Sequence, residues 1–249
     1  MVVLKNAREL VEMSEACKIS AQALHIAQKY MRAGVSTKEI DEAIHREIVS
    51  HGAKPSFLGY GGFPASACIS VNHQVIHGIP SSKVILKDGD IVSVDVGAFY
   101  KGYHGDNAFT YRVGEVSQEA AKLLEVTNEC LYRAIEQAKP GNRMGDISYA
   151  VESYARSFGY GVVKNYVGHG VGRNLHEDPE VPNFGTKGKG IRLVKGMTLA
   201  IEPMINLVGD NVKMLSDGWT VETVSGSLSA HFEHTIVITD DGAKILTKI

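Results

Sequence analysis

Hydrophobic residues recur at helical spacing in four stretches of the chain. In one of these stretches, Ile40, Ile44 and Ile48 fall on a single face of a helix. Ser36 or Thr37 can cap the first turn of that helix. The spacing predicts helices near residues 5–31, 37–51, 117–138 and 143–158.

Shorter stretches are continuously apolar, or alternate between apolar and polar residues, as strands do. They are bounded by glycine, proline and other turn residues. This pattern predicts strands near residues 67–71, 75–77, 90–99, 105–112, 162–164, 198–206, 219–223 and 231–238.

The series of predicted elements repeats along the chain. Gly89 and Gly196 are 107 positions apart, and the same offset relates the glycines that precede and follow the second helix of each half. Six residues after each of these two glycines stands a carboxylate, Asp95 in the first half and Glu202 in the second. Such a repeat indicates two copies of one structural unit.

Each half has the order helix, helix, His-Gly strand, and two strands that carry carboxylates. Chance similarity between two amphipathic stretches is the alternative explanation. An ordered series that places polar residues in apolar strands favours duplication instead. We therefore expect a single catalytic domain over residues 1–249, built from halves of about 1–115 and 116–249.

Two carboxylates of the first half stand in or beside an apolar strand. Burying an unpaired carboxylate is costly, so Asp95 within residues 91–99 requires a cation or strong hydrogen-bond donors. A hairpin centred on residues 100–101 would place Asp95 directly opposite Asp106. Like charges so placed repel each other unless metal ions or protons neutralise them.

The second half repeats this arrangement. A tight turn at Asp217-Gly218 would place Glu202 opposite Glu233, although about 30 residues separate the two acids. Four carboxylates together with a histidine from one of the His-Gly segments suit divalent metal ions. Two ions bridged by carboxylates form a recurrent hydrolytic site, so this pattern predicts a two-metal hydrolase.

Each of these residues has an ordinary structural explanation when taken alone. An aspartate in a strand is more often hydrogen-bonded at a bulge or an edge, and His-Gly pairs such as His77 or His169 are common in turns. Cys68 lies in a half-buried strand, which favours a packing role over a nucleophilic one. Only the duplicated pattern makes the metal site the better hypothesis.

Composition narrows the class of protein. The chain has 249 residues, of which 44% are hydrophobic and 22% charged, and its net charge of −2 argues against nucleic-acid or membrane-surface binding. Its three cysteines are too few for a disulfide framework and favour a reducing compartment. We find no signal peptide and no stretch of about 18 apolar residues, so we expect a cytoplasmic protein.

With these residues in view, the chain resembles the type I methionine aminopeptidases over essentially its whole length. The resemblance rests on residues 68–72, 77–80, 88–97, 102–106, 168–172, 201–203 and 233–235. It implies the α+β "pita-bread" fold, a pseudo-two-fold architecture in which two pairs of α-helices cover a curved antiparallel β-sheet. That fold agrees with the repeat.

The resemblance also implies the roles of the metal ligands. Asp106 and Glu233 would bridge two divalent ions, Asp95 would bind one of them, and His169 and Glu202 would bind the other. Co, Mn, Fe, Zn and Ni all tolerate such ligands, so the sequence leaves the physiological metal open.

Further residues receive roles by the same resemblance. His77 would contact the substrate near the scissile amide, His176 would stabilise the tetrahedral oxyanion, and Glu202 would also shuttle protons. The methionine pocket would be formed by Tyr60, Phe63, Cys68, Leu175 and Trp219. Phe63 and Leu175 depart from the tyrosine and phenylalanine frequent there, and Phe57 from a frequent cysteine. All three remain apolar, so a methionine side chain should still fit.

The implied activity is removal of the initiator methionine from nascent proteins and peptides when the second residue is small, through a water activated by two metals. Peptides and nascent chains that begin with methionine would be the partners of a monomeric enzyme. The basic loop at residues 187–195 suggests transient contact with the ribosome. One alternative is an Xaa-Pro aminopeptidase of the same fold, although those usually carry a further N-terminal domain. A non-catalytic binding module is the other.

Overall fold

The computed structural model describes residues 1–248. Four long helices, α1 (Ala7–Gln28), α2 (Thr37–Ser50), α3 (Gln118–Gln137) and α4 (Met144–Ser157), match the four predicted from hydrophobic spacing. Ser36 caps α2 as expected, and Ser117 caps α3 in the same way, each through a side chain that accepts a backbone N–H.

The strands and one short 3₁₀ helix, η1 (Tyr60–Gly62), complete the fold. In the first half the strands are β1 (Lys54–Pro55), β2 (Ala67–Val71), β3 (Gln74–Ile76), β4 (Ile91–Tyr100) and β5 (Tyr103–Arg112). In the second half they are β6 (Gly161–Val162), β7 (Gly168–Gly170), β8 (Glu177–Val181), β9 (Thr198–Ile201), β10 (Met204–Asn206), β11 (Val212–Met214), β12 (Val221–Thr223), β13 (Ser229–His231), β14 (Glu233–Thr239) and β15 (Gly242–Ile245).

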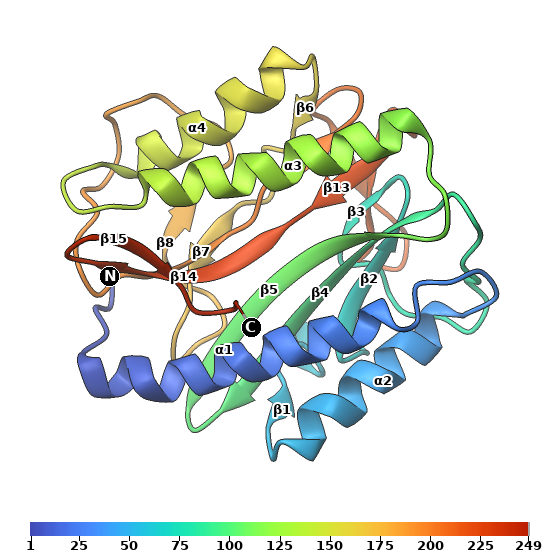
Figure 1. The fold of residues 1–249 in the computed structure, drawn as a ribbon, viewed down its shortest axis with the longest axis horizontal. Helices are drawn as coiled ribbons and strands as arrows, with labels where there is room; N and C mark the ends of the chain where they lie inside the picture. The colour runs from blue at the N-terminus through green and yellow to red at the C-terminus, as the bar shows by residue number, and fades with distance from the viewer. Residues whose placement is uncertain (249) are drawn as a thin grey trace.

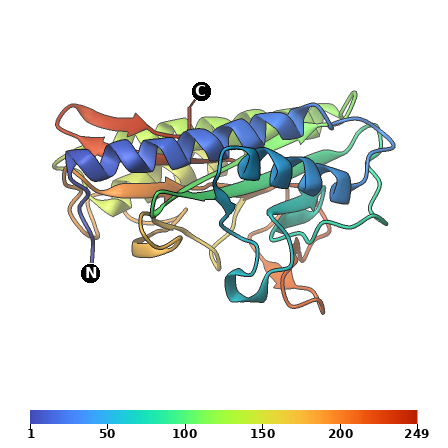
Figure 2. The same ribbon diagram turned by 90° about the horizontal axis from the view of Figure 1, so that it is seen from below.

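The helices form one layer and the sheets the other. Nine strands make one antiparallel sheet in the order β1-β4-β5-β14-β9-β7-β8, with β2 added beside β4 and β15 beside β14. Figure 2 shows all four long helices on one face of this curved sheet, while η1 and the β11–β12 hairpin project from the other. α1 and α2 cover the strands of the first half, and α3 and α4 those of the second (Figure 1). This arrangement is the pita-bread fold expected from the sequence.

Each helix pair encloses its own apolar core. Ile40, Ile44 and Ile48 of α2 are fully buried against strand residues such as Val92 and Val94. A second core lies beneath α3 and α4. Burial of each such side chain stabilises the fold by about 1.5–3 kcal/mol. The amphipathic periodicity of each helix therefore determines which of its sides packs against the sheet.

The expected register of the first hairpin was wrong by two residues. The loop between β4 and β5 is Lys101-Gly102, and both residues have positive φ, 50° and 87°. A two-residue loop of this kind matches the twist of the strands. Asp95 therefore faces Ala108, and Asp106 faces Gly97. Because side chains alternate with period two, a shift of two leaves both acids on the same face, as diagonal neighbours.

The expected register of the second hairpin was correct. Ile201 pairs with His234 and Met204 pairs with His231, which leaves Glu202 level with Glu233.

Two strands that the sequence predicts as continuous are each divided in the structure. The 198–206 stretch becomes β9 and β10, and the 231–238 stretch becomes β13 and β14. Pro203 lies at the first break. Proline lacks the backbone N–H that a continuous ladder needs, so the strand is interrupted there. Five strands lie outside the predicted residue ranges. β1, β8, β11 and β15 are short and at least partly exposed, so no apolar run marks them. β7 is buried, but only its His-Gly pair marked it in the sequence.

Within residues 1–248, none of the helices combines the length and the apolar character that a membrane span requires.

Candidate metal centre and substrate cavity

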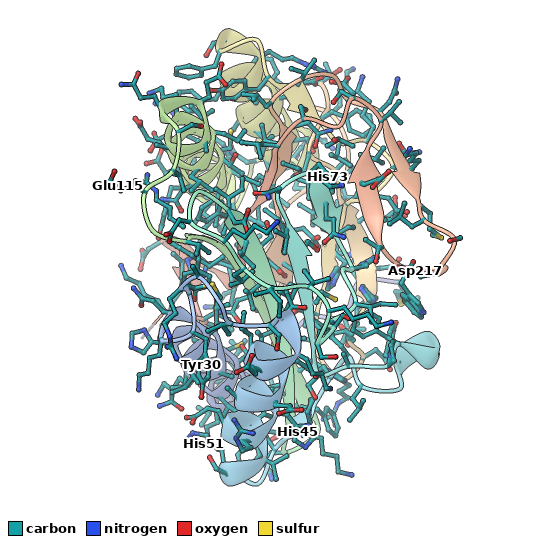
Figure 3. All side chains as sticks on the ribbon, turned by 90° about the vertical axis from the view of Figure 1, so that its right-hand side faces the viewer. Tyr30, His45, His51, His73, Glu115 and Asp217 are labelled. Atoms are coloured by element: carbon teal, nitrogen blue, oxygen red, sulfur yellow. The ribbon has the colours of Figure 1, made fainter. Side chains whose placement is uncertain are left out.

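A cavity of about 250 Å³ lies where strands of the nine-stranded sheet meet η1 and the β11–β12 turn. These two segments project from the sheet face opposite the helices (Figure 2). The floor of the cavity comes from β4, β5, β7 and β14, and its rim from η1 and the turn of the β11–β12 hairpin, where Figure 3 labels Asp217. Every residue for which the sequence suggested a catalytic, metal-binding or substrate-binding role lines this cavity: Tyr60, Phe63, Cys68, His77, Asp95, Asp106, His169, Leu175, His176, Glu202, Trp219 and Glu233.

The floor concentrates carboxylates around one imidazole. Asp106, His169 and Glu233 are buried, and each offers a ligand atom within 4.8 Å of the other two. Nε2 of His169 lies 3.6 Å from Oε1 of Glu202 and 3.8 Å from Oδ2 of Asp106. Asp95 joins them from β4, close enough to Asp106 that the two carboxyls influence each other's ionisation.

Several of these oxygens have no hydrogen-bond partner among the described residues. They are Asp95 Oδ1, Asp106 Oδ1 and Glu233 Oε1, all fully shielded from solvent. Buried acceptors without donors are costly. Orphaned carboxylate oxygens on three neighbouring acids, two of which share a cluster with the His169 imidazole, fit a divalent cation.

The electrostatics of the floor lead to the same conclusion. Burial raises the pKa of Asp106 to about 7. Burial, followed by the charges of neighbouring acids, raises the pKa values of Asp95, Glu202 and Glu233 well above their ordinary range. Metal binding requires the ionised forms, so a cation entering this site would displace protons.

His169 is oriented to offer a lone pair. Its Nδ1 donates to the Gly170 carbonyl oxygen at 2.8 Å, which leaves Nε2 free to face the acids. Burial, and secondarily the neighbouring charge of His176, lowers its pKa to about 3. The ring is therefore neutral at physiological pH, as a metal ligand must be.

The two other histidines of the cavity are also neutral. Nδ1 of His176 lies 2.7 Å from the Tyr60 hydroxyl, and its ring centroid is 4.2 Å from that of His169. Burial lowers the pKa of His176, and burial with the charge of His176 lowers that of His77 to about 4. His77 follows β3 with a φ of 58° and packs edge-on against Trp219. A neutral imidazole can donate or accept a proton at neutral pH.

One end of the cavity is apolar. Phe57, Phe63, Cys68 and Leu175 are buried there, and the Trp219 indole lies edge-on to Phe63 at 5.1 Å. η1 brings its backbone against this indole, because a side chain at Gly61 would meet Trp219 at 3.2 Å. Phe57, Phe63 and Leu175, the positions where the sequence departs from the common pattern, all contribute to this apolar surface.

Other contributors were not identified from the sequence. Ile76, Tyr166 and Val167 line the cavity, the last two directly before the His169 segment. His231 is also buried, with Nε2 3.7 Å from Oε2 of Glu202. Its place in β13, two residues before Glu233, is the only sequence signal that marks it.

The metal-free chain should lose stability as pH rises from about 6.5 to 8. In this window the folded acids, such as Asp106 with a pKa near 7, retain protons that the unfolded chain has released. Raised folded pKa values therefore lower the free energy of unfolding, by roughly 1 kcal/mol per pH unit. The buried histidines do not contribute above their ordinary value of 6.5, because they are then neutral in both states.

Denaturant titrations at several pH values with a chelator, and again with Mn²⁺, would measure this slope. Metal should abolish it. An equal slope with and without metal would show that the site carboxylates are not its source.

Comparisons with known proteins agree with this geometry. The profile of metallopeptidase family M24 matches residues 11–240. Methionine aminopeptidase 1 of Bacillus subtilis is 52% identical over the full length of both chains, and the methionine aminopeptidase of Clostridium acetobutylicum is 51% identical over 99% of each. A crystal structure of methionine aminopeptidase from Thermotoga maritima superposes with a TM-score of 0.99 at 47% identity, with complete coverage of both. Prolidase from Pyrococcus furiosus gives a TM-score of 0.81 at 27% identity, with 99% of this chain covering 66% of that one.

Proposed function

The chain belongs to metallopeptidase family M24, among the methionine aminopeptidases, and we propose that it removes the N-terminal methionine from peptides and nascent proteins. The observation that carries this proposal is the union of two features in one cavity. A buried carboxylate and histidine cluster lies next to an apolar recess bounded by Phe63, Leu175 and Trp219. An unbranched apolar side chain suits that recess.

The five ligands of the proposed centre would be Asp95, Asp106, His169, Glu202 and Glu233, which would hold two divalent ions. When bound, such ions lower the pKa of water and polarise the scissile carbonyl. Ionised carboxylates from both halves of the chain would balance the positive charge of the two ions. The identity of the metal, among Co, Mn, Fe, Zn and Ni, depends on availability as much as on affinity.

The surrounding side chains would handle protons and orientation. Glu202, whose second carboxylate oxygen lies 3.7 Å from His231 Nε2, would receive a proton from the attacking water and pass it to the leaving amine. His176 would donate a hydrogen bond from Nε2 to the developing oxyanion, because Tyr60 hydrogen-bonds its Nδ1. His77 would face the amide from the opposite wall.

The residues at the rim of the cavity support a requirement for a small second residue. Tyr60 of η1 and Trp219 of the β11–β12 turn line this rim, and a bulky side chain after the methionine would meet them. We further propose that the enzyme is monomeric and cytoplasmic. It would consist of one catalytic domain built from two related halves.

Contact with the ribosome is a further part of this proposal. The side chains of Lys187, Lys189, Arg192 and Lys195 are exposed, and RNA would attract such a cluster.

Two peptides distinguish this activity from that of an Xaa-Pro aminopeptidase. With added divalent metal, we expect Met-Ala-Ser to be cleaved and Ala-Pro-Ala to remain intact, because the apolar recess has room for a methionine side chain. Chromatographic detection of the released amino acid measures both reactions. The reverse preference would assign the chain to the Xaa-Pro peptidases, and cleavage of neither would favour a binding module.

A further inference from the structure

The loop that carries Leu175 and His176 is held by a residue from the opposite end of the sequence. Lys5 precedes α1, yet its ammonium group forms an ion pair with the carboxylate of Glu177, the residue after His176. Both side chains are nearly inaccessible, 3% exposed for Lys5 and 7% for Glu177. The pair lies next to Gly172, at the start of the loop that carries Leu175 and His176, and neither member lines the cavity.

The Glu177 carboxylate ties the loop at two points. Its Oε2 accepts from the Lys5 ammonium, and its Oε1 accepts the backbone N–H of Asn174 at 3.1 Å. Leu175 and His176 lie between Asn174 and Glu177 in the chain. The Glu177 carboxylate therefore closes the turn that presents both side chains to the cavity. Glu177 can do this only while a cation balances its charge in that buried place.

The packing around the pair shows that the loop is fitted to it. A side chain at Gly172 would meet Lys5 Cε at 2.5 Å and Glu177 Oε1 at 2.7 Å. The absence of a side chain at Gly172 therefore makes room for the ion pair. Lys5 is itself fixed, because its N–H donates to the Gly196 carbonyl at 2.9 Å and its ammonium donates to the Val3 carbonyl at 3.1 Å.

A second tie to the same loop is much weaker. The Arg173 guanidinium lies 3.3 Å from Glu9 of α1 and rests over the Tyr103 ring. Its side chain is 63% exposed, and exposed ion pairs contribute little. Of these two ion pairs, Lys5–Glu177 therefore supplies the stronger restraint.

From this geometry we infer that Lys5 is a positioning residue for substrate recognition, which acts through Glu177 to hold Leu175 against the methionine side chain and His176 toward the scissile carbonyl. The inference rests on the proposed function. It assigns to the N-terminal segment control over both the rate and the choice of the first substrate residue.

Three variants test this role. Lys5→Met removes the ammonium but retains the chain length, and Lys5→Arg retains a cation. Arg156→Met is the matched control, because it breaks the Arg156–Asp210 ion pair, neither member of which lines the cavity. For each metal-loaded variant, kcat and KM are measured on Met-Ala-Ser and on the same peptide with norleucine first, together with the melting temperature.

We expect Lys5→Met to lower kcat/KM on Met-Ala-Ser by about ten- to a hundredfold, the effect of a small displacement of reacting groups. The ratio of methionine to norleucine cleavage should change by roughly threefold or more, because Leu175 moves with the loop. Lys5→Arg should recover most of the rate. Arg156→Met should lower the melting temperature while leaving the rate per folded molecule and the ratio unchanged.

A Lys5→Met enzyme that behaves like Arg156→Met, with lower stability but unchanged rate and ratio, would overturn the inference. If Lys5→Met does not fold, Glu177→Gln replaces it, since the amide oxygen can still accept the Asn174 N–H while the charge is lost. The same drop in rate and change in ratio are expected, and their absence would be equally contradictory.

A readout that is independent of turnover separates this inference from the proposed function. Trp219 is the single tryptophan of the chain and lines the cavity, so its fluorescence reports occupancy by free methionine. If wild-type protein fails to cleave Met-Ala-Ser, the proposed function fails. Weaker methionine binding by Lys5→Met than by wild type would still support the positioning role, and equal binding would refute it.

Discussion

Asp106→Ala should abolish peptide cleavage, by roughly a thousandfold or more, and should eliminate two-metal binding. Asp106 belongs to the buried cluster with His169 and Glu233, and its Oδ2 lies 3.8 Å from His169 Nε2. Its loss would leave no carboxylate ligand on β5, the strand that carries it. Rate assays with saturating Mn²⁺, together with calorimetric metal titration, measure both effects.

The fold should survive this change. Without metal, Asp106→Ala removes one of several mutually repelling buried carboxyls, so the variant should melt no lower than metal-free wild type at pH 8. Asp240→Ala is a suitable control, because Asp240 is exposed and remote from the cavity, and it should leave rate and metal content unchanged. Unchanged metal stoichiometry in Asp106→Ala would refute the ligand assignment.

His176→Ala should have the second largest effect, a loss of about a hundred- to a thousandfold in kcat/KM, as expected for a donor to a developing oxyanion. His176 is not among the proposed ligands, so metal stoichiometry should stay at its wild-type value. Steady-state kinetics and metal analysis on one preparation distinguish these outcomes.

His51→Ala serves as the control for this variant. Figure 3 labels His51 at the end of α2, where it pairs with Glu47, away from the cavity. We expect His51→Ala to leave kcat/KM unchanged. A His176→Ala enzyme with normal kcat/KM, or one that has lost its metal, would contradict the role given to this side chain.

The positions of the helices and the strand register of the second half could be predicted, because local sequence signals determine both. Amphipathic spacing and a capping serine mark α2, and its buried isoleucines then choose the face of the sheet that it covers. Similarly, Asp217-Gly218 correctly set the register that brings Glu202 level with Glu233.

The first hairpin shows where such reasoning fails. Lys101 adopts a φ of 50°, a conformation more typical of glycine, asparagine or aspartate, so nothing in its identity indicated the first position of the loop. The acids nevertheless reached the same face, because an error of two residues preserves the alternation of side chains.

Two features of the site could not be derived from spacing alone. His77 and His169 occupy similar His-Gly segments, but His169 lies within a strand that faces the acids, whereas His77 follows its strand with positive φ. The second is the pairing of Lys5 with Glu177, which joins residues 172 positions apart. A contact of that range depends on the tertiary fold and leaves no local pattern.

If the carboxylate and histidine cluster holds the catalytic metal, methionine release must depend on divalent ions. Wild-type chain is stripped of metal with a chelator, mixed with Met-Ala-Ser, and titrated with Mn²⁺ while free methionine is measured. We predict no release before metal is added and a rate that rises to a plateau as the ions bind. Release at full rate in the presence of excess chelator would show that the reaction needs no metal and would refute the metal site.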